Sequence, residues 1–450
     1  MTQVIKIRKG LDINLKGKAL TEDTVYAGKS KSYAIIPGHY TGIMPKALVR
    51  EGDAVRMGAP VMCDKMRPEI KFVSPVNGTV SGVNRGEKRK LMSITIKPDE
   101  QIAGEPIEMR DLSSYDAGGL KALLLETGLW PYIRQRPYDR VANPSDTPRD
   151  IFVTACNSAP LAPDMEFLVN PADGYLQTGL GVLARLTGGK VYLGVKAGSP
   201  LTALSRDAET VELDGPHPAG NVGVLINSVR PVNKGEVVWT LNAADVYLIG
   251  RMLKEKTFDF SKVIALTGPE FKNRGYARVI SGCTVGSVTK GNAAEEHVRL
   301  ISGNVLTGTK VAPDDYLGAY DYQITAIPEG DDVDEFFGWA MPGLEKYSMS
   351  RSYFSWMRGG KKEYVLDARI RGGRRAMIMS NEYDRVFPLD ILPEYLLKAI
   401  IAFDIDKMER LGIYEVAPED FALCEFVDTS KIELQKIVRN GLDLLYREMN

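Results

Sequence analysis

Short stretches of alternating apolar and polar residues open the chain, which is the pattern of strands with one buried face. At the N-terminus Val4, Ile5 and Ile7 are interleaved with basic residues, and no longer apolar segment follows them. We therefore expect residues 1–10 to form a strand of the folded protein and not a secretion signal. Further on, Asn77-Gly78 separates two apolar runs, a combination that predicts a β-hairpin with a two-residue turn.

From about residue 112 the apolar spacing becomes that of helices alternating with buried strands. Leu120, Leu123 and Leu124 predict a helix that ends near Gly128. Strands that alternate with helices build an α/β domain with a partly parallel sheet. The later segments are a strand at 151–155, a helix at 175–186, strands at 191–195 and 236–241, and a helix that Asn242 caps and that carries Val246, Ile249, Met252 and Leu253.

The last part of the chain combines short strands with a helical end. Strands are expected at 262–268, 277–280 and 298–301, between Gly-rich turns, as in a small β-grasp-like unit of the SLBB type. Helical spacing returns at 391–410 and at 432–446. We therefore expect a small mixed sheet followed by a helical C-terminal end.

The first hundred residues carry turn phrases of a known small β fold. Val49-Arg-Glu-Gly-Asp53, Gly58-Ala-Pro-Val61 and the segment 72–80 resemble the turns of the biotinyl/lipoyl-type barrel-sandwich domain. Cys63-Asp64-Lys65 is similar to the lipoyl-bearing hairpin, but Met66-Arg67-Pro68 follows directly and the spacing to the Gly-Asp turn is shorter than in that family. We expect a barrel without a covalent arm; a lipoyl or biotin carrier modified at Lys65 is the alternative.

The predicted fold class is therefore a multidomain protein of α/β and β type. The expected divisions are a barrel-sandwich domain at 1–105, an α/β domain at 112–260, a β-grasp-like domain at 261–330 and a C-terminal region at 331–450 that ends in helices.

Composition narrows the function classes. With 450 residues, 44% of them hydrophobic and 26% charged, the chain is long enough for about three globular domains. Its net charge of −1 gives no basic excess, so nucleic acid is not an expected partner. No run approaches the roughly 18 apolar residues of a membrane span, so any membrane role must be peripheral. The four cysteines form no CxxC pair, which argues against a disulfide framework, a zinc site or a complete iron–sulfur motif and favours a cytoplasmic location.

One loop could bind an anion. The Pro- and Gly-rich segment 214–221 leads directly into an apolar helical pattern, and N–H groups at a helix start are unpaired. The same loop can equally be a stiff connection between a strand and a helix, and His217 within it shares both interpretations. With three histidines in the chain and no Cys near this one, a metal site here is not expected. The GxGxxA pattern at 179–184 lies inside a predicted helix and lacks the following acidic residue, so we do not interpret it as a dinucleotide motif.

Aromatic residues are concentrated at 336–343 and 353–356, which hold Trp339 and Trp356. Such a concentration is typical of a protein core, and a surface that faces a partner is the alternative. The acidic run 329–335 and the basic runs 358–362 and 369–375 are expected to be solvated loops.

Several phrases together resemble one family. Lys9-Gly-Leu-Asp12, Val49-Arg-Glu-Gly-Asp53, Asp214-Gly-Pro-His-Pro-Ala-Gly220 and Phe337-Gly-Trp-Ala-Met-Pro-Gly343 are similar to the A-type subunit of the Na⁺-translocating NADH:quinone oxidoreductase, over essentially the whole chain. The resemblance implies a peripheral subunit on the cytoplasmic side of a six-subunit membrane pump, which passes electrons from NADH to quinone and exports Na⁺. The expected partners are the other five subunits, chiefly the membrane subunits, and quinone.

A more distant resemblance, to the flavin-bearing NADH-binding subunit of respiratory complex I and to the C-type subunit of the Rnf complex, indicates what this chain lacks. Those relatives hold FMN with a loop of the type GLGGAGFPT, where this chain has the bulkier segment 128–138. They also carry CxxCxxC and a fourth Cys for an iron–sulfur cluster, where this chain keeps Cys424 alone. We therefore expect no bound flavin, no iron–sulfur cluster and no catalytic residue in this chain.

The altered loop suggests a site of a different kind. Its aromatic and arginine side chains could form a cleft for a quinone, whose ring stacks on aromatic faces and whose carbonyls accept hydrogen bonds. The alternative is that the aromatic residues fill the former flavin pocket as core. A second function class, an autonomous flavin- or quinone-dependent reductase, also remains open. The candidate quinone contacts are Trp130, Tyr132, Arg134, Arg136 and Tyr138.

Overall fold

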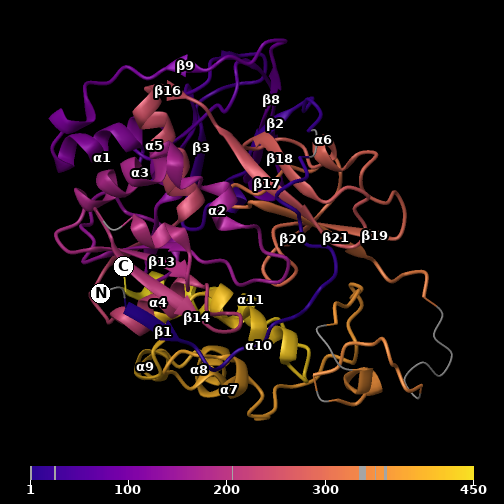
Figure 1. Cartoon of the computed structure of the whole chain (residues 1–450). Coiled ribbons are helices and arrows are strands. Elements are labelled where there is room, and N and C mark those ends of the chain that lie inside the picture. Colours follow the sequence, from indigo (N-terminus) through magenta and orange to yellow (C-terminus); the bar gives the residue numbers. More distant parts are fainter. Residues whose placement is uncertain are drawn as a thin grey trace.

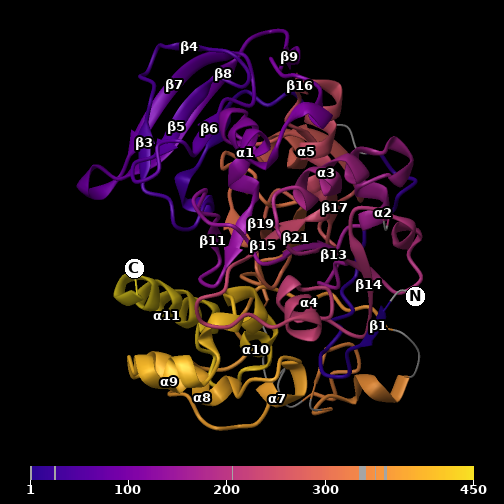
Figure 2. The same ribbon diagram turned by 90° about the vertical axis from the view of Figure 1, so that its left-hand side faces the viewer.

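The computed structural model describes residues 3–24, 27–204, 206–333, 341–349, 351–358 and 362–449. Four parts can be followed in Figure 1: the N-terminal strands at the top, a central sheet with helices, a second sheet on the right and a helical C-terminal part below. Figure 2, turned by 90°, shows the N-terminal strands above the central sheet and the C-terminal helices beneath it. The expected fold class, a barrel sandwich, an α/β domain and a β-grasp-like sheet with a helical end, is confirmed.

The N-terminal part is a sandwich of two small antiparallel sheets, with strand orders β2-β8-β7-β4 and β3-β5-β6. Its apolar side chains form part of the hydrophobic core, and Val61, Met62, Ile70, Ile94 and Ile96 are fully buried. The strands are β2 Tyr33–Ile35, β3 Pro45–Ala47, β4 Ala54–Val55, β5 Pro60–Asp64, β6 Lys71–Val73, β7 Gly78–Arg85 and β8 Leu91–Pro98.

The hairpin expected at Asn77-Gly78 is wrong. β6 pairs with β5, and β7 pairs with β8 and β4, so the link between β6 and β7 crosses from one sheet to the other. The Asn77 Oδ1 atom accepts a hydrogen bond from the Met57 N–H at 2.6 Å, which anchors the crossing. Gly78 is required there because a Cβ atom would lie 2.1 Å from the Lys97 carbonyl oxygen. The sequence signal of a tight turn therefore marks a close backbone approach.

The central sheet has seven strands in the order β1-β14-β13-β12-β15-β10-β11. The first five run parallel, and β10 and β11 are antiparallel. The chain leaves β12 in one direction through β13 to β14 and then returns to the other side of β12 as β15. The topological switch point therefore lies between β12 and β15, where doubly wound folds bind ligands at the carboxyl ends of the strands. The strands are β1 Gln3–Lys6, β10 Arg134–Arg136, β11 Arg140–Val141, β12 Ile151–Ala155, β13 Val191–Lys196, β14 Glu209–Asp214 and β15 Val238–Asn242.

The N-terminal strand lies in this central sheet and not in the sandwich. β1 pairs in parallel with β14, with Val4 opposite Glu212. The expected first division at 1–105 thus contains a strand that completes the α/β part. Its apolar alternation marked it as a strand, but a partner about 200 positions away cannot be inferred from local pattern.

The helices of the α/β part pack closely because of two glycines. A Cβ atom on Gly179 of α3 would lie 2.3 Å from the Val246 carbonyl oxygen, and one on Gly250 of α5 would lie 1.9 Å from the Tyr175 carbonyl oxygen. The GxGxxA pattern therefore lies within a helix, as expected, and its first glycine serves helix packing. The helices are α1 Ala117–Glu126, α2 Met165–Leu168, α3 Tyr175–Ala184, α4 Val222–Val229 and α5 Ala243–Glu255, and Asn242 caps α5 as expected.

The second sheet and the helical end complete the molecule. The second sheet has the order β18-β17-β21-β19-β20, and a short ribbon pairs β9 with β16. Phe403, in the left-handed region with φ of +56°, separates two helices where one longer pattern was predicted. The elements are β9 Glu105–Pro106, β16 Thr257–Phe258, β17 Ser261–Thr267, β18 Gly275–Ile280, α6 Gly286–Thr289, β19 Val298–Ser302, β20 Thr309–Val311, β21 Gln323–Pro328, α7 Tyr383–Val386, α8 Pro393–Ile401, α9 Ile405–Arg410, α10 Ala422–Val427 and α11 Leu434–Met449.

Candidate functional site

Two cavities meet at Tyr132, where the sandwich, the α/β part and the second sheet come together. Helix α1 ends at Glu126 with Thr127 as its C-cap, and Gly128, with φ of +68°, reverses the chain direction. A 3-10 turn, Trp130–Tyr132, follows and has Pro131 in its first positions. This short turn sends Trp130 into the core and leaves Tyr132 between the cavities.

Trp130 is a core residue. Its side chain is fully buried, and its Nε1–H donates to the Ala142 carbonyl at 2.8 Å. Its ring meets the ring of Trp239 edge to face, with centroids 5.2 Å apart. In this structure the indole belongs to the hydrophobic core and lines neither cavity, as the core alternative predicts.

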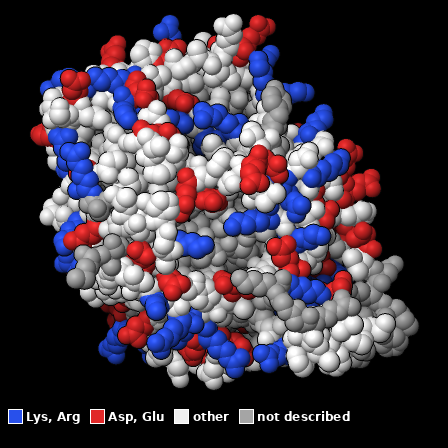
Figure 3. All heavy atoms as spheres, viewed as in Figure 1, with Lys and Arg blue, Asp and Glu red and all other residues white. Residues whose placement is uncertain are grey.

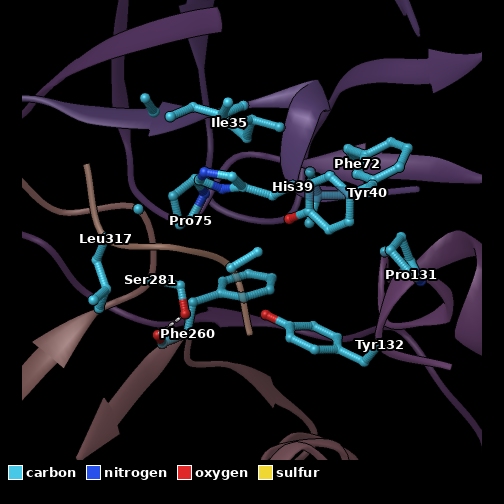
Figure 4. Close-up of a pocket in the computed structure, with 16 residues that line it drawn as sticks. Ile35, His39, Tyr40, Phe72, Pro75, Pro131, Tyr132, Phe260, Ser281 and Leu317 are labelled. Carbon is cyan, nitrogen blue, oxygen red and sulfur yellow. Dashed lines mark hydrogen bonds between the residues drawn. The ribbon is translucent and has the colours of Figure 1, made fainter. Parts of the chain in front are cut away.

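The first cavity, called the aromatic cavity here, is bounded by Tyr40, Phe72, Tyr132, Phe260 and the apolar side chains of Ile35 and Leu317 (Figure 4). Its volume of about 50 Å³ is sufficient for a few waters. Figure 4 shows the Tyr132 hydroxyl and the His39 ring directed toward this space. The cavity therefore has aromatic walls and a small number of polar groups.

The polar groups of the aromatic cavity are neutral. Burial lowers the pKa of His39 below its ordinary value, although Asp321 acts in the opposite direction. Burial also raises the pKa of Tyr132 far above the ordinary range, so its hydroxyl keeps its proton. The Ser281 hydroxyl donates to the Phe260 carbonyl at 3.1 Å. An uncharged imidazole and hydroxyls beside aromatic rings suit an uncharged ligand with carbonyl acceptors.

The second cavity, called the switch-point cavity here, has a volume of about 460 Å³ and contacts the ends of β12 and β15 through Thr154 and Asn242. Its other walls are the loop from His217 to Val222, the second sheet and the C-terminal helices, and the Tyr132 ring separates it from the aromatic cavity. It therefore lies where a doubly wound sheet places a ligand.

Two interactions define the chemistry of the switch-point cavity near Tyr132. Arg134 pairs with Asp139 at 2.5 Å. Asp245 is 2% exposed and accepts a hydrogen bond from the Tyr322 hydroxyl at 2.6 Å. Burial raises the pKa of Asp245 to about 7, against the opposing effect of this hydrogen bond. Asp245 can thus be neutral or charged near neutral pH.

His217 is held by its own loop. Its Nδ1 atom lies 3.1 Å from the Ser158 Oγ atom, which also accepts the Gly220 N–H at 2.8 Å. The backbone N–H of His217 donates to Asp12 at 2.9 Å, and burial lowers the pKa of its imidazole to about 4. His217 is therefore neutral near pH 7. Both interpretations of the loop have support, because it connects β14 rigidly to α4 and also lines the switch-point cavity.

The start of α4, where an anion was considered, faces a carboxylate of the same chain. A Cβ atom on Gly223 would lie 2.3 Å from the Asp420 Oδ1 atom, so this side chain touches the first turn of the helix. Asp420 is 3% exposed, accepts the Ala417 N–H at 2.8 Å and pairs with Arg136 at 3.2 Å. A negative group is favourable at a helix N-terminus. Asp420, from the C-terminal part, thus places a carboxylate at the helix start where binding of an external anion was considered.

The five candidate quinone contacts do not form one cleft. Trp130 is core, and Arg136, 1% exposed, is held by Asp420 and by Glu419 at 2.9 Å. Tyr132 lines both cavities, and Arg134 lines the switch-point cavity. Tyr138 lies in a third cavity at the edge of the sheet. The single cleft expected from the sequence is therefore corrected: alternate residues of β10 point to opposite faces, and the chain turns after Pro137.

Residues of the aromatic cavity that the sequence analysis missed come from the sandwich. His39 and Tyr40 follow β2, and Phe72 lies on β6. His39 is one of three histidines in the chain, and this rarity could have marked it as a candidate. No local sequence pattern, however, relates it to Tyr132, which lies more than ninety positions later.

The cysteines are all buried, and no disulfide joins them. Burial raises the pKa of Cys424, which lies in α10, so the thiol is protonated. Within the described ranges, the group of side chains close enough to share a metal ion is the exposed set His297, Asp331 and Asp332. No helix in the described part of the chain is long and apolar enough to cross a membrane.

A doubly wound sheet with a cavity at its switch point, joined to a barrel sandwich and a β-grasp-like sheet, defines a multidomain protein of the α/β class. Comparisons with known proteins narrow this class. Family models match in sequence order: the NqrA N-terminal barrel-sandwich hybrid domain at 5–99, the NqrA second alpha/beta domain at 115–258 and the NQRA C-terminal domain at 263–312.

Whole-chain relatives agree with the family models. The chain is 37% identical to the A-type subunit of the Na(+)-translocating NADH-quinone reductase of Pasteurella multocida, over 99% of this chain and 100% of the relative. Identity to the corresponding subunits of Yersinia pestis bv. Antiqua and Vibrio vulnificus is 36% and 37%, with the same coverage. The chain therefore belongs to the NqrA family, the A-type subunits of the Na⁺-translocating NADH-quinone reductase, an oxidoreductase complex. A solved NAD⁺-reducing [NiFe]-hydrogenase chain is similar at 12% identity, over 75% of this chain and 64% of that chain, with a TM-score of 0.38, which is too low to carry an argument.

Proposed function

We propose that this chain is a peripheral, cytoplasmic subunit of a Na⁺-pumping NADH:quinone oxidoreductase, that it carries no flavin or iron–sulfur cluster, and that it shapes the access of quinone. The names of the relatives support the role in the complex. The catalytic electron transfer belongs to the assembly, and this chain contributes binding surfaces.

The aromatic cavity is the observation that carries the quinone proposal. A quinone head group is flat, apolar on its faces and a hydrogen-bond acceptor at its two carbonyls. Aromatic rings of Tyr40, Phe72 and Phe260 provide walls, and His39 and Tyr132 provide neutral N–H and O–H donors.

The head group needs more room than the aromatic cavity offers alone. Tyr132 is the wall between this cavity and the larger switch-point cavity. Rotation of its ring toward the larger space joins the two volumes without disturbing the sandwich. Arg134, on the far side of Tyr132, would then face the second carbonyl of the head group. Of the five contacts expected from the sequence, these two are retained in the proposal.

The absence of flavin is proposed on two grounds. Phosphate of a nucleotide would meet Asp420 at the start of α4, where two negative charges repel each other. The segment after α1 presents Trp130 and Pro131 in place of glycines, which prevents the close backbone approach that a flavin phosphate needs. The absence of an iron–sulfur cluster is proposed because Cys424 is one thiol, and four ligands are needed for a four-iron cluster.

A surface for the other subunits is proposed at the segment 341–357. On the face shown in Figure 3, basic and acidic side chains are interspersed, whereas the described atoms at the lower right corner are largely white. Trp356 is 55% exposed there, and its apolar neighbours are also exposed: Met341, Leu344, Met349, Phe354 and Met357. Such a patch is suited to burial against a protein partner. Trp339, the other tryptophan of this region, lies outside the described residues.

The quinone proposal can be tested by titrating the full chain with a short-chain ubiquinone and following protein fluorescence. Tyr132→Phe and His39→Leu should each weaken binding about tenfold, because each removes a donor worth about 1.4 kcal/mol. Tyr395→Phe, on the exposed face of α8, is the matched control and should change nothing. Equal affinity of all four proteins, or no binding by the wild type, rejects the site.

The alternative, an autonomous reductase, makes a different prediction for the same preparation. A flavin or iron–sulfur protein absorbs visible light, so a stoichiometric chromophore in the purified chain would reject the cofactor-free subunit. A mass increase at Lys65 would in turn support the carrier alternative. Copurification with membrane subunits tests the location.

A further inference from the structure

A third cavity of about 410 Å³ lies at the outer edge of the central sheet. We call it the edge cavity. It is bounded by Tyr138 and Arg140 beside β10 and β11, by Arg67 from the sandwich, and by Tyr446 near the end of α11. In Figure 2, β11 lies below the sandwich strands and above α11, so the edge cavity is formed where three parts of the chain meet. Its volume is in the range of small-molecule sites.

Three tyrosines give this cavity an aromatic lining. The ring of Tyr138 meets the ring of Tyr446 edge to face, with centroids 5.3 Å apart, and that of Tyr414 at 6.1 Å. Tyr414 is fixed by its hydroxyl, which donates to Glu409 at 2.5 Å. A planar ring that enters such a cluster can stack on one tyrosine and meet the edge of another.

Arg140 supplies a positive charge in a fixed position. Its guanidinium carbon lies 3.6 Å from the centroid of the Tyr446 ring, so the two groups are in contact as a cation–π pair. A Cβ atom on Gly42 would lie 2.5 Å from the Arg140 Nε atom, so the glycine allows the guanidinium to reach this position. The group is therefore held between a backbone and an aromatic face before any ligand arrives.

The charge of Arg140 has no carboxylate partner within the described residues, whereas the arginines around it do. Arg67 pairs with Asp64 at 2.8 Å, and Arg439 pairs with Asp443 at 3.0 Å. The buried Nε atom of Arg140 also lacks a hydrogen-bond partner in the described structure. Of the other charged groups of the lining, Lys234 pairs with Glu409 at 2.6 Å and Glu236 with Arg149 at 2.7 Å. The Asp146 carboxylate accepts hydrogen bonds from the side-chain amides of Gln135 at 2.7 Å and Asn143 at 3.1 Å. An unmatched guanidinium remains for a ligand.

We infer that the edge cavity binds a planar aromatic molecule that carries one carboxylate or phosphate group. The anionic group would pair with Arg140, which presents N–H donors in the fork geometry that matches carboxylate and phosphate oxygens. The ring would lie among Tyr138, Tyr414 and Tyr446. This site is separate from the aromatic cavity proposed for quinone, and neither proposal depends on the other.

Equilibrium dialysis of the full chain against 2-naphthoate, which is itself fluorescent, tests the inference. Binding is expected with Kd on the order of 100 µM. 2-Naphthol has the same ring without the charge, and inorganic phosphate has the charge without the ring; each should bind at least tenfold more weakly. Competition by AMP in addition to benzoate would identify a site that accepts phosphate, and competition by benzoate alone a site restricted to carboxylates.

Variants connect the binding to the named residues. Arg140→Gln should weaken 2-naphthoate binding at least tenfold, and Arg140→Lys, which keeps the charge but not the fork, about threefold to tenfold. Tyr446→Phe, which keeps the ring, should bind as the wild type does. Arg278→Gln removes an exposed arginine of β18 and is the matched control. The inference is overturned if the wild type does not bind 2-naphthoate below 5 mM (about 50 times the expected Kd), if 2-naphthol binds equally well, or if both Arg140 variants, folded by their melting curves, retain full affinity.

Discussion

Replacement of Trp130 by alanine separates the two roles that its position allows. The side chain is fully buried and meets Trp239 edge to face. Loss of a buried Trp side chain costs about 3–5 kcal/mol through lost burial and the cavity it leaves. The Ala142 carbonyl would also lose its Nε1–H partner in a buried site, which adds about 1–3 kcal/mol unless water enters the new space. We expect a loss of at least about 4 kcal/mol for the α/β part.

Differential scanning calorimetry can measure this loss. For a part of roughly 150 residues, about 2–4 °C of Tm is lost per kcal/mol, so its transition should fall by about 8–16 °C. Trp130→Phe keeps much of the volume and loses the hydrogen bond, and it should fall by about a third as much. The control Trp356→Ala, at a 55% exposed position, should shift the transition by less than about 2 °C. If Trp130→Ala keeps its stability and loses quinone affinity, the assignment of Trp130 to the core is refuted.

Three further predictions follow from the buried charges and the exposed patch. Burial raises the pKa of Asp245 to about 7, so its neutral form favours folding; this contribution is complete below about pH 4 and is lost as the pH rises through 7. Asp245→Asn cannot ionise and should flatten the fall of Tm between about pH 4 and 7, and an unchanged profile would count against a raised pKa. Arg136→Met leaves buried carboxylates unpaired and should cost about 3–5 kcal/mol by chemical denaturation, part of which the added change Asp420→Asn should restore; a neutral single variant would contradict the pairing. Trp356→Ala should leave folding intact and reduce copurification with the membrane subunits, and undiminished assembly would exclude this side chain from the interface.

The elements that the sequence predicted well are those whose pattern is local and complete. The segment 151–155 is apolar except at Thr154 because β12 is buried on both faces in a parallel sheet. Asn242 is a cap because its side chain accepts the Ala244 N–H. The hairpin at Asn77-Gly78 failed because turn residues report the local backbone and not which strand the next segment joins. The pairing of β1 with β14 is likewise a contact between distant segments, which periodicity does not encode.

The candidate site was also predicted only in part, because contacts between distant segments decide which side chains can face a ligand. The bulky residues after α1 correctly indicated an altered loop, but whether each one faces a cavity depends on partners elsewhere. Arg136 is a donor available to a ligand only if no carboxylate reaches it, and Asp420, 284 positions away, does. Tyr132 keeps a ligand-facing position because residues of the sandwich, Tyr40 and Phe72, stop short of filling the space in front of it.

Asp420 links the fold to the proposed loss of nucleotide binding. A helix start at the carboxyl edge of a doubly wound sheet attracts an anion, and a protein that does not bind nucleotide must satisfy that tendency in another way. Here the Asp420 carboxylate touches Gly223 and places a negative charge at the start of α4. The same carboxylate pairs with Arg136 of β10. One side chain of the C-terminal part therefore contacts α4 and β10, on the two sides of the switch point. Removal of this charge alone would leave the helix start unmatched and would leave the guanidinium with Glu419, at 2.9 Å, as its remaining close carboxylate. For that reason Asp420→Ala should be more destabilising than Asp420→Asn, whose amide can still accept one hydrogen bond. Anion binding at α4 should be regained in the Ala variant only, as inorganic phosphate raising its Tm but not that of the wild type.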